Sequence, residues 1–227
     1  MITTEIGLKE EIITSWIKTH STVLELGCGN GVLLNKLKSE RGVAVHGIEI
    51  DDLSVRECVR KGLDVLHEPA DEALADYVTG AFDYVIFNDS LQRVVNKPDT
   101  VLTEALRVGK RVIIAVPNFA HIKARSQIFF QGRTPVTASL PYEWYNTPNL
   151  HFLSIADILA YFRRRGIKLE AASYASGNRA VKILPNLLAL TGVFLISKSP
   201  IPFPMAIMFS ARHMGGTVWL LPRHTKR

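Results

Sequence analysis

A glycine-rich turn between an apolar run and a helical pattern limits most strongly what this chain can fold into. Residues 23–26 have the character of a buried strand, and Gly27, Gly29 and Gly31 follow at every second position. Leucines at helical spacing come next, at residues 33–37. Glycine lets a backbone turn sharply and lets a ligand approach the backbone amides. The segment therefore predicts a strand, a tight turn and a helix that begins beside a bound ligand.

The spacing of the glycines separates two classes of nucleotide-binding protein. The dinucleotide fingerprint is G-x-G-x-x-G, whereas here the third glycine comes earlier and Glu25 precedes the first. The pattern E-x-G-x-G-x-G resembles the first motif of class I methyltransferases that use S-adenosylmethionine (SAM). In that family the loop contacts the methionyl part of SAM, and the acid helps to hold its ammonium group. The alternative is a plain strand-to-helix turn, for which one glycine would be enough.

Three polar residues follow later predicted strands, at the edge where open α/β sheets bind ligands. Glu49 ends the second strand, and a carboxylate there can accept two hydrogen bonds from ribose hydroxyls. Its alternative role is to cap the next helix, for which Asp51 is better placed. Asp71 follows the third strand, where SAM enzymes commonly contact the adenine amino group, although it can equally start a helix. Asn88 ends the fourth strand on the same side.

Apolar runs and helical patterns alternate along the chain as far as Pro117. This alternation predicts an α/β fold with a Rossmann-like, doubly wound, mostly parallel sheet of the class I SAM methyltransferase type. Two late runs, 167–172 and 193–197, are expected to form the antiparallel hairpin that closes the sheet in these methyltransferases. We expect one domain over residues 1–199 and a proline-containing C-terminal extension over 200–227, to which we assign no function.

Composition and charge exclude several other classes. The 227 residues carry a net charge of +6 and are 47% hydrophobic, which fits one domain with a sizeable core. The positive charge is spread out and no base-stacking motif accompanies it, so nucleic acid is not an expected partner. Cys28 and Cys58 lack C-x-x-C partners, so no metal site is predicted. The apolar stretch 183–196 is short for a membrane span, and a soluble cytoplasmic protein is expected.

Residues 118–152 form a long segment that is dense in aromatic residues and prolines, which is typical of a lid or a contact surface. His121, Tyr142, Tyr145 and His151 are its candidate catalytic residues, and either histidine can serve as a general base. The alternative for each is a positioning or packing role within the segment. If the protein is an enzyme, the reaction is displacement at the sulfonium methyl group, for which the protein mainly supplies alignment and a dry site.

Several further segments have a specific sequence: 82–86, Leu91-Gln92, 117–121, 132–137 and, most specifically, Leu-Pro-Tyr-Glu-Trp-Tyr-Asn-Thr-Pro-Asn-Leu-His at 140–151. Through these segments the chain resembles the methionine biosynthesis protein MetW family from about residue 10 to about residue 197. One departure follows the third strand, where the family usually has Gly-Asp-Leu-Asp and Pro69 replaces the first of the two acids.

The resemblance implies a role in methionine biosynthesis alongside homoserine O-acyltransferase (MetX), with SAM as the cofactor. Three functions stay open from the sequence. The first is a methyltransferase that acts on a small molecule or a protein. The second is a non-catalytic SAM-sensing partner of the acyltransferase with residues 141–152 as its interface, because tyrosine and tryptophan suit such surfaces. The third, a nucleic-acid methyltransferase, is suggested only by the positive charge.

Overall fold

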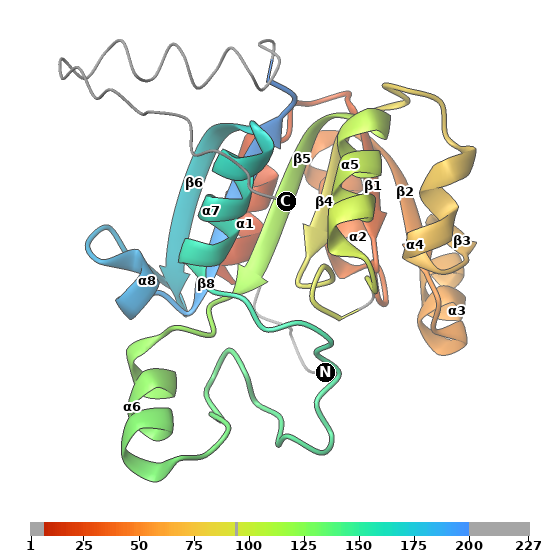
Figure 1. Cartoon of the computed structure of the whole chain (residues 1–227). Helices are drawn as coiled ribbons and strands as arrows, with labels where there is room; N and C mark the ends of the chain where they lie inside the picture. The colour runs from red at the N-terminus through yellow and green to blue at the C-terminus, as the bar shows by residue number, and fades with distance from the viewer. Residues whose placement is uncertain (1–6, 94, 200–227) are drawn as a thin grey trace, which may run out of the picture.

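The computed structural model describes residues 7–93 and 95–199 of the 227-residue chain, so the C-terminal extension lies outside the described part. The strands are β1 (Thr22–Leu26), β2 (Ala44–Glu49), β3 (Asp64–His67), β4 (Phe82–Asn88), β5 (Gly109–Pro117), β6 (Lys168–Ser176), β7 (Arg179–Ala180) and β8 (Thr191–Ser197). Within the described residues they form one sheet of eight strands in the order β3-β2-β1-β4-β5-β8-β6-β7 (Figure 1).

The first five strands of the chain pair in parallel, as the alternating pattern predicts. β1 lies between β2 and β4, with Glu25 opposite Gly47 on one side and Ile86 on the other. The strand order therefore reverses at β1, and the carboxyl ends of β1 and β4 meet at this switch point. Open α/β sheets bind their ligands at such a point.

The two late runs close the sheet with antiparallel strands, as expected. β8 pairs antiparallel with β5, and β6 pairs antiparallel with β8, with a register shift between Leu169 and Ala171. The connection from β6 to β8 is longer than a tight hairpin turn, because it includes the short strand β7 and the helical turn α8 (Pro185–Leu188).

Helices cover both faces of the sheet (Figure 1). A serine before an apolar helical pattern predicts a helix start at Ser154, and the Ser154 hydroxyl accepts from the Asp157 amide at 3.2 Å in a capping box at the start of the seventh helix. Besides α8, the helices are α1 (Leu8–Trp16), α2 (Val32–Arg41), α3 (Asp52–Arg60), α4 (Ala70–Ala73), the 3-10 turn η1 (Leu74–Asp76), α5 (Pro98–Val108), α6 (Ile122–Gln131) and α7 (Ile155–Arg165).

Two predicted helix boundaries are wrong. The pattern at Leu91 suggests a helix start, but residues 91–93 form a turn. The Gln92 carbonyl accepts hydrogen bonds from the amides of Leu150 (2.8 Å) and His151 (3.2 Å), so it is not available to a following helical turn. The apolar spacing of residues 12, 13, 16 and 17 favours a first helix that ends near His20, yet α1 ends at Trp16, and the backbone at Ile17 is already extended.

The central strands are buried on both faces, which explains their nearly continuous apolar sequence. Leu24 and Leu26 face a cluster built with α5 and α7, whereas Val23 faces a second cluster built with α1 and α2. Within the described core, the alternation of β1 between two clusters fixes its register, because a one-residue shift would exchange its two faces.

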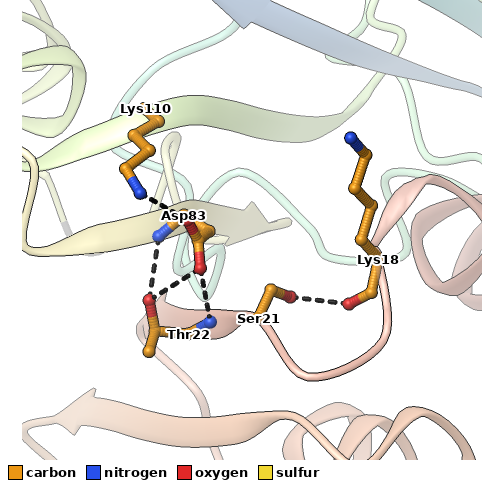
Figure 2. A network of polar contacts seen from close by, with 5 residues as sticks. All are labelled: Lys18, Ser21, Thr22, Asp83 and Lys110. Atoms are coloured by element: carbon orange, nitrogen blue, oxygen red, sulfur yellow. Dashed lines mark hydrogen bonds and ion pairs between the residues drawn. The ribbon is translucent and has the colours of Figure 1, made fainter.

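Hydrogen bonds of polar side chains connect the amino ends of the central strands (Figure 2). The Asp83 carboxylate, at the start of β4, accepts from the amide of Thr22 at 2.9 Å and from Lys110 Nζ at 2.8 Å. The Thr22 hydroxyl in turn accepts from the Asp83 amide at 3.0 Å. The hydrogen bonds from Lys110 and Thr22 lower the pKa of Asp83. This end of the sheet is therefore tied by charge-assisted hydrogen bonds across β1, β4 and β5.

Candidate functional site

The glycine loop leaves the carboxyl end of β1 in a backbone conformation that favours glycine. Gly27, Gly29 and Gly31 have φ values of 67°, 54° and 72°, all in the left-handed region. The Gly27 amide donates to the Ile48 carbonyl at 2.8 Å, which anchors the loop to β2. The predicted order of strand, glycine turn and helix is confirmed, with Gly31 directly before α2.

Close packing adds a second requirement at Gly31. A Cβ atom there would lie 2.4 Å from Leu63 Cδ1 and 2.8 Å from Cys58 Sγ. Cys28, on the loop itself, packs against Gly47, where an added Cβ would lie 2.6 Å from the sulfur. The two cysteines therefore fill the space behind the loop, which agrees with a packing role for Cys28.

Glu49 ends β2 beneath this loop and is buried. One of its carboxylate oxygens accepts from the Gly29 amide at 2.7 Å, and the other accepts from the amides of Ile50 (2.8 Å) and Asp51 (2.9 Å). A carboxylate offers about four acceptor positions, so the clamp leaves one for a ligand. The cap of α3 is Asp51, which accepts from the Ser54 amide at 2.9 Å.

A pocket of about 260 Å³ opens at the carboxyl ends of β1 and β2. It brings together Gly27, Glu49 and Asp71 of the predicted site. It also contains Arg93 and Asn96, which the sequence reasoning missed, because Arg93 lies in the turn after β4 and Asn96 follows it, where the sequence pattern favours a helix. The pocket is lined by Gly27, Ile48, Glu49, Ile50, Glu68, Pro69, Ala70, Asp71, Arg93, Asn96 and Leu150.

Asp71 lies early in α4 and joins two parts of the pocket. One carboxylate oxygen accepts from the Asn96 amide at 3.0 Å, while the other is buried without a hydrogen-bond partner in the described part of the chain. Pro69, the residue that departs from the family pattern, precedes α4 and gives this wall an apolar surface.

Glu25 is the most deeply buried acid of the predicted site, with 2% of its surface exposed. Its Oε2 atom has no partner among the described residues. Burial raises the pKa of Glu25 to about 8, while a hydrogen bond from Asn88 and the charge of Lys9 act in the opposite direction. A buried carboxylate with a free oxygen favours a cationic donor, because the ligand charge would offset the lost hydration.

The unpartnered polar atoms of the described residues gather at this one end of the sheet. They come from the carboxyl ends of β1 and β4, from α4 after β3, and from the long segment that contacts the turn after β4. All except a serine hydroxyl are carboxylate or amide oxygens, which matches a ligand rich in N–H and O–H groups. These atoms are Glu25 Oε2, Asp71 Oδ1, Asn88 Oδ1, Asp89 Oδ1, Ser90 Oγ, Gln92 Oε1 and Asn149 Oδ1.

SAM fits this set of acceptors. Its ammonium group, ribose hydroxyls and adenine amino group are all donors, and its sulfonium adds a second positive charge. The glycine loop also leaves open space at Gly29, where an added Cβ would meet nothing within 4 Å. A ligand can therefore approach the backbone closely at this position.

The two candidate histidines are both engaged in hydrogen bonds that hold the long segment. His121 precedes α6, and its Nδ1 accepts from the Lys123 amide at 3.2 Å. Burial, with the charge of Lys123, lowers the pKa of His121. His151 Nε2 lies 3.1 Å from the Val95 carbonyl, beside the turn after β4. Their catalytic role stays a prediction, since each has a structural use.

The two candidate tyrosines have different surroundings. Tyr142 lies under the guanidinium of Arg93, 5.9 Å from the ring centre to the carbon, and Arg93 lines the pocket. Tyr145 is exposed and packs edge-on against Trp144, with ring centres 5.7 Å apart. The structure thus brings Tyr142 and His151 to the turn after β4, while Tyr145 and His121 make other contacts.

No described helix is long and apolar enough to cross a membrane. No group of three or more histidine, cysteine or acidic side chains in the described part is arranged to hold a metal ion.

Solved structures with a similar fold are SAM-dependent methyltransferases. One from Thermotoga maritima has a TM-score of 0.59 at 16% identity and covers 85% of this chain and 88% of its own. One from Thiobacillus denitrificans, in complex with S-adenosyl-L-homocysteine, has a TM-score of 0.53 at 15% identity and covers 72% and 65%. At these identities the likeness shows the fold, which is that of class I SAM methyltransferases.

Sequence comparison gives the family. A bifunctional methionine biosynthesis protein MetXA/MetW from Rhodopirellula baltica is 30% identical over 190 residues, which cover 80% of this chain and 30% of that protein. The chain thus spans under a third of the length of this curated relative. The family model described as methionine biosynthesis protein MetW matches residues 9–196. The chain therefore belongs to the MetW family.

Proposed function

We propose that this protein binds SAM at the carboxyl ends of β1, β2 and β4 and acts in methionine biosynthesis together with homoserine O-acyltransferase. The observation that carries the proposal is the set of buried, unpartnered oxygens around the glycine loop. An acceptor-rich site of this kind leaves polar groups without partners unless a donor-rich ligand enters it.

In this proposal each part of the site recognises a different group of SAM. Glu25 and Asn88 would accept from the ammonium group, and Glu49 would accept from the ribose with the acceptor position that its backbone contacts leave free. Asp71 would accept from the adenine amino group. Bound SAM supplies a methyl group that its positive sulfur already activates.

The proposed partnership with the acyltransferase has two supports. The relative from Rhodopirellula baltica joins MetXA and MetW in one bifunctional protein. In this chain, α6 and the long segment lie beyond the carboxyl end of β5 (Figure 1) and carry exposed aromatic side chains. Phe129, Phe130, Trp144 and Tyr145 are all at least 70% exposed, and aromatic residues of this kind are enriched at protein interfaces.

Two modes of action follow from SAM binding. The fusion of MetXA and MetW in the relative and the exposed aromatic side chains of this chain favour a SAM-responsive partner of the acyltransferase, and SAM, as a downstream product of the pathway, would report its output. Of the two candidate bases, His121 accepts from the Lys123 amide through Nδ1. His151 instead donates to the Val95 carbonyl through Nε2 and keeps Nδ1 as an acceptor. Methyl transfer is the second candidate, since a carboxylate acceptor would need no base.

An acyltransferase assay separates the two modes. The rate of the acyltransferase is measured with this protein added, in the presence and absence of SAM, while conversion of SAM to S-adenosylhomocysteine is followed in the same samples. We expect the acyltransferase rate to depend on SAM without its consumption. Consumption of SAM with an unchanged acyltransferase rate would instead identify an independent methyltransferase.

Co-purification tests whether the exposed aromatic residues form the interface with the acyltransferase. Replacing Trp144 and Tyr145 together by alanine should abolish recovery of the acyltransferase with this protein. Val78 is similarly exposed (74%) near the start of β4, at the opposite end of the sheet, so Val78→Ala is a matched control that should leave recovery unchanged. Equal recovery with both variants would exclude this surface as the interface.

A further inference from the structure

Lys9, the second residue of α1, reaches a residue far along the chain at the ligand edge of the sheet. Its ammonium group forms an ion pair with Asp89, which directly follows β4, and lies 3.3 Å from the Glu10 carboxylate. The Lys9 side chain is only 20% exposed. A lysine ammonium has three N–H donors, so these two contacts leave one N–H available within the described surroundings.

The backbone at Asp89 holds this pair in place. Asp89 has a φ of 57°, which is uncommon for a residue with a side chain. Its amide donates to the Ala115 carbonyl of β5 at 3.1 Å, so the conformation is fixed by the sheet. Non-glycine residues in this region tend to occur at functional sites. One carboxylate oxygen of Asp89 meets Lys9, while the other is buried without a partner in the described residues.

One cation and three carboxylates, those of Glu10, Glu25 and Asp89, therefore lie near the carboxyl ends of β1 and β4. Glu25 Oε2 is unpartnered among the described residues, and the charge of Lys9 acts on Glu25. The amino-acid end of SAM carries the complementary set of charges, with an ammonium, a sulfonium and one carboxylate. An exposed ion pair would contribute little to stability, but a lysine held beside a buried acid is suited to a ligand with charges of both signs.

We propose that Lys9 binds the carboxylate of the amino-acid group of SAM, while Glu25 and Asp89 accept hydrogen bonds from its ammonium group. This inference rests on the proposed SAM binding and adds a residue from α1, outside the glycine loop, that recognises the zwitterionic part of the ligand. It assigns the N-terminal helix a role in distinguishing SAM and S-adenosylhomocysteine from nucleosides that lack the amino-acid group.

Binding of three ligands tests the assignment. Calorimetry compares SAM, S-adenosylhomocysteine and methylthioadenosine, which has the nucleoside and the sulfur but no amino-acid group. Lys9→Met keeps the apolar stem and removes the charge. We expect it to weaken SAM and S-adenosylhomocysteine by about tenfold to a hundredfold, the effect of one charge-assisted hydrogen bond, and to leave methylthioadenosine unchanged. Lys9→Arg should bind SAM within about threefold of the wild type.

Lys18→Met is the matched control, because Lys18 is an exposed lysine near the amino end of the sheet (Figure 2). It should bind all three ligands as the wild type does. The assignment is overturned if Lys9→Met binds SAM normally, or if it loses methylthioadenosine as strongly as SAM. If the wild type binds neither SAM nor methylthioadenosine, the proposed function itself fails, which is distinct from a failure of Lys9 alone.

Discussion

The two ends of the parallel sheet use polar residues in opposite ways. At the amino end, the Asp83 carboxylate accepts hydrogen bonds from Thr22 and Lys110, and these hydrogen bonds lower the pKa of Asp83. At the carboxyl end, Glu25 is buried with a free oxygen, and burial raises its pKa to about 8. The amino end therefore stabilises the fold, while the carboxyl end retains acceptors that have no partner among the described residues and suit a donor-rich ligand.

The glutamate Glu170 supports the same contrast at the antiparallel side of the sheet. It lies near the start of β6 and accepts from Arg111 and Ser197, each at 2.8 Å. Burial acts to raise the pKa of Glu170, but the hydrogen bonds from Ser197 and Arg111 lower it below its ordinary value. At the carboxyl end, by contrast, Glu25, Asp71 and Asp89 each keep one oxygen without a partner among the described residues, which indicates that these oxygens are retained for binding.

The largest expected effect concerns Gly31, a loop glycine that also packs tightly. Gly31→Ala combines a left-handed backbone with contacts of 2.4 Å to Leu63 and 2.8 Å to Cys58. We expect a loss of about 3 kcal/mol in the free energy of unfolding, measured by urea denaturation. Gly29→Ala is the matched control, since the space there is open, and should lose only about 1 kcal/mol. Equal losses would contradict the packing argument.

Asp83→Ala should remove the hydrogen bonds at the amino end of the sheet without affecting SAM binding at the carboxyl end. Losing charge-assisted hydrogen bonds to Thr22 and Lys110 should lower the free energy of unfolding by about 2 kcal/mol at pH 7, with unchanged SAM affinity. Asp64→Ala is the control, because that carboxylate is 72% exposed and its pair with His46 should contribute little. A large loss of SAM affinity in Asp83→Ala would show that the two ends are coupled.

Glu25→Gln should stabilise the ligand-free protein, whereas the two preceding substitutions should destabilise it. Because the folded pKa of Glu25 (about 8) lies above its ordinary value of 4.5, the ligand-free protein loses stability as pH rises between these values. The amide variant removes this loss, so its Tm should exceed that of the wild type by about 4–8 °C at pH 8, equivalent to about 2 kcal/mol. At pH 5 the difference should nearly vanish. A lower Tm for Glu25→Gln than for the wild type at pH 8 would contradict the claim that burial of Glu25 costs stability in the ligand-free protein.

The same variant should weaken SAM binding by about tenfold, because an amide cannot offer the negative charge that the ammonium group needs. A gain in stability together with a loss of SAM affinity would show that Glu25 contributes to binding and not to the stability of the ligand-free fold. Unchanged affinity would remove Glu25 from the proposed site.

Local sequence patterns predicted much of the fold. The glycine loop, the acids at the ends of β1 and β2, and the late antiparallel strands all follow from spacing and strand ends. The turn at 91–93 did not, because the carbonyl of Gln92 bonds to amides of Leu150 and His151 that lie far along the chain. Arg93 and Asn96 reach the pocket only through this turn, so no local pattern pointed to them.

The role of single polar residues was harder to predict than the place of the site. Glu49 was expected to face the ribose, and the structure adds that it clamps the glycine loop through the Gly29 amide. His121 looked like a base in sequence, but it caps α6, a use that depends on where that helix begins. Lys9 carried no motif, and only the fold brings it to Asp89.

Calorimetric titration with SAM measures directly whether the site at the carboxyl ends of β1 and β2 binds this ligand. We expect the wild type to bind one SAM per chain, and Glu49→Ala to weaken this binding at least about tenfold, because the acid both orders the glycine loop and offers the ribose an acceptor. Asp51→Ala, which removes only the cap of α3, should bind SAM normally. The absence of binding by the wild type would contradict the proposed SAM site. Equal affinities of Glu49→Ala and Asp51→Ala for SAM would contradict the role of Glu49 in that site.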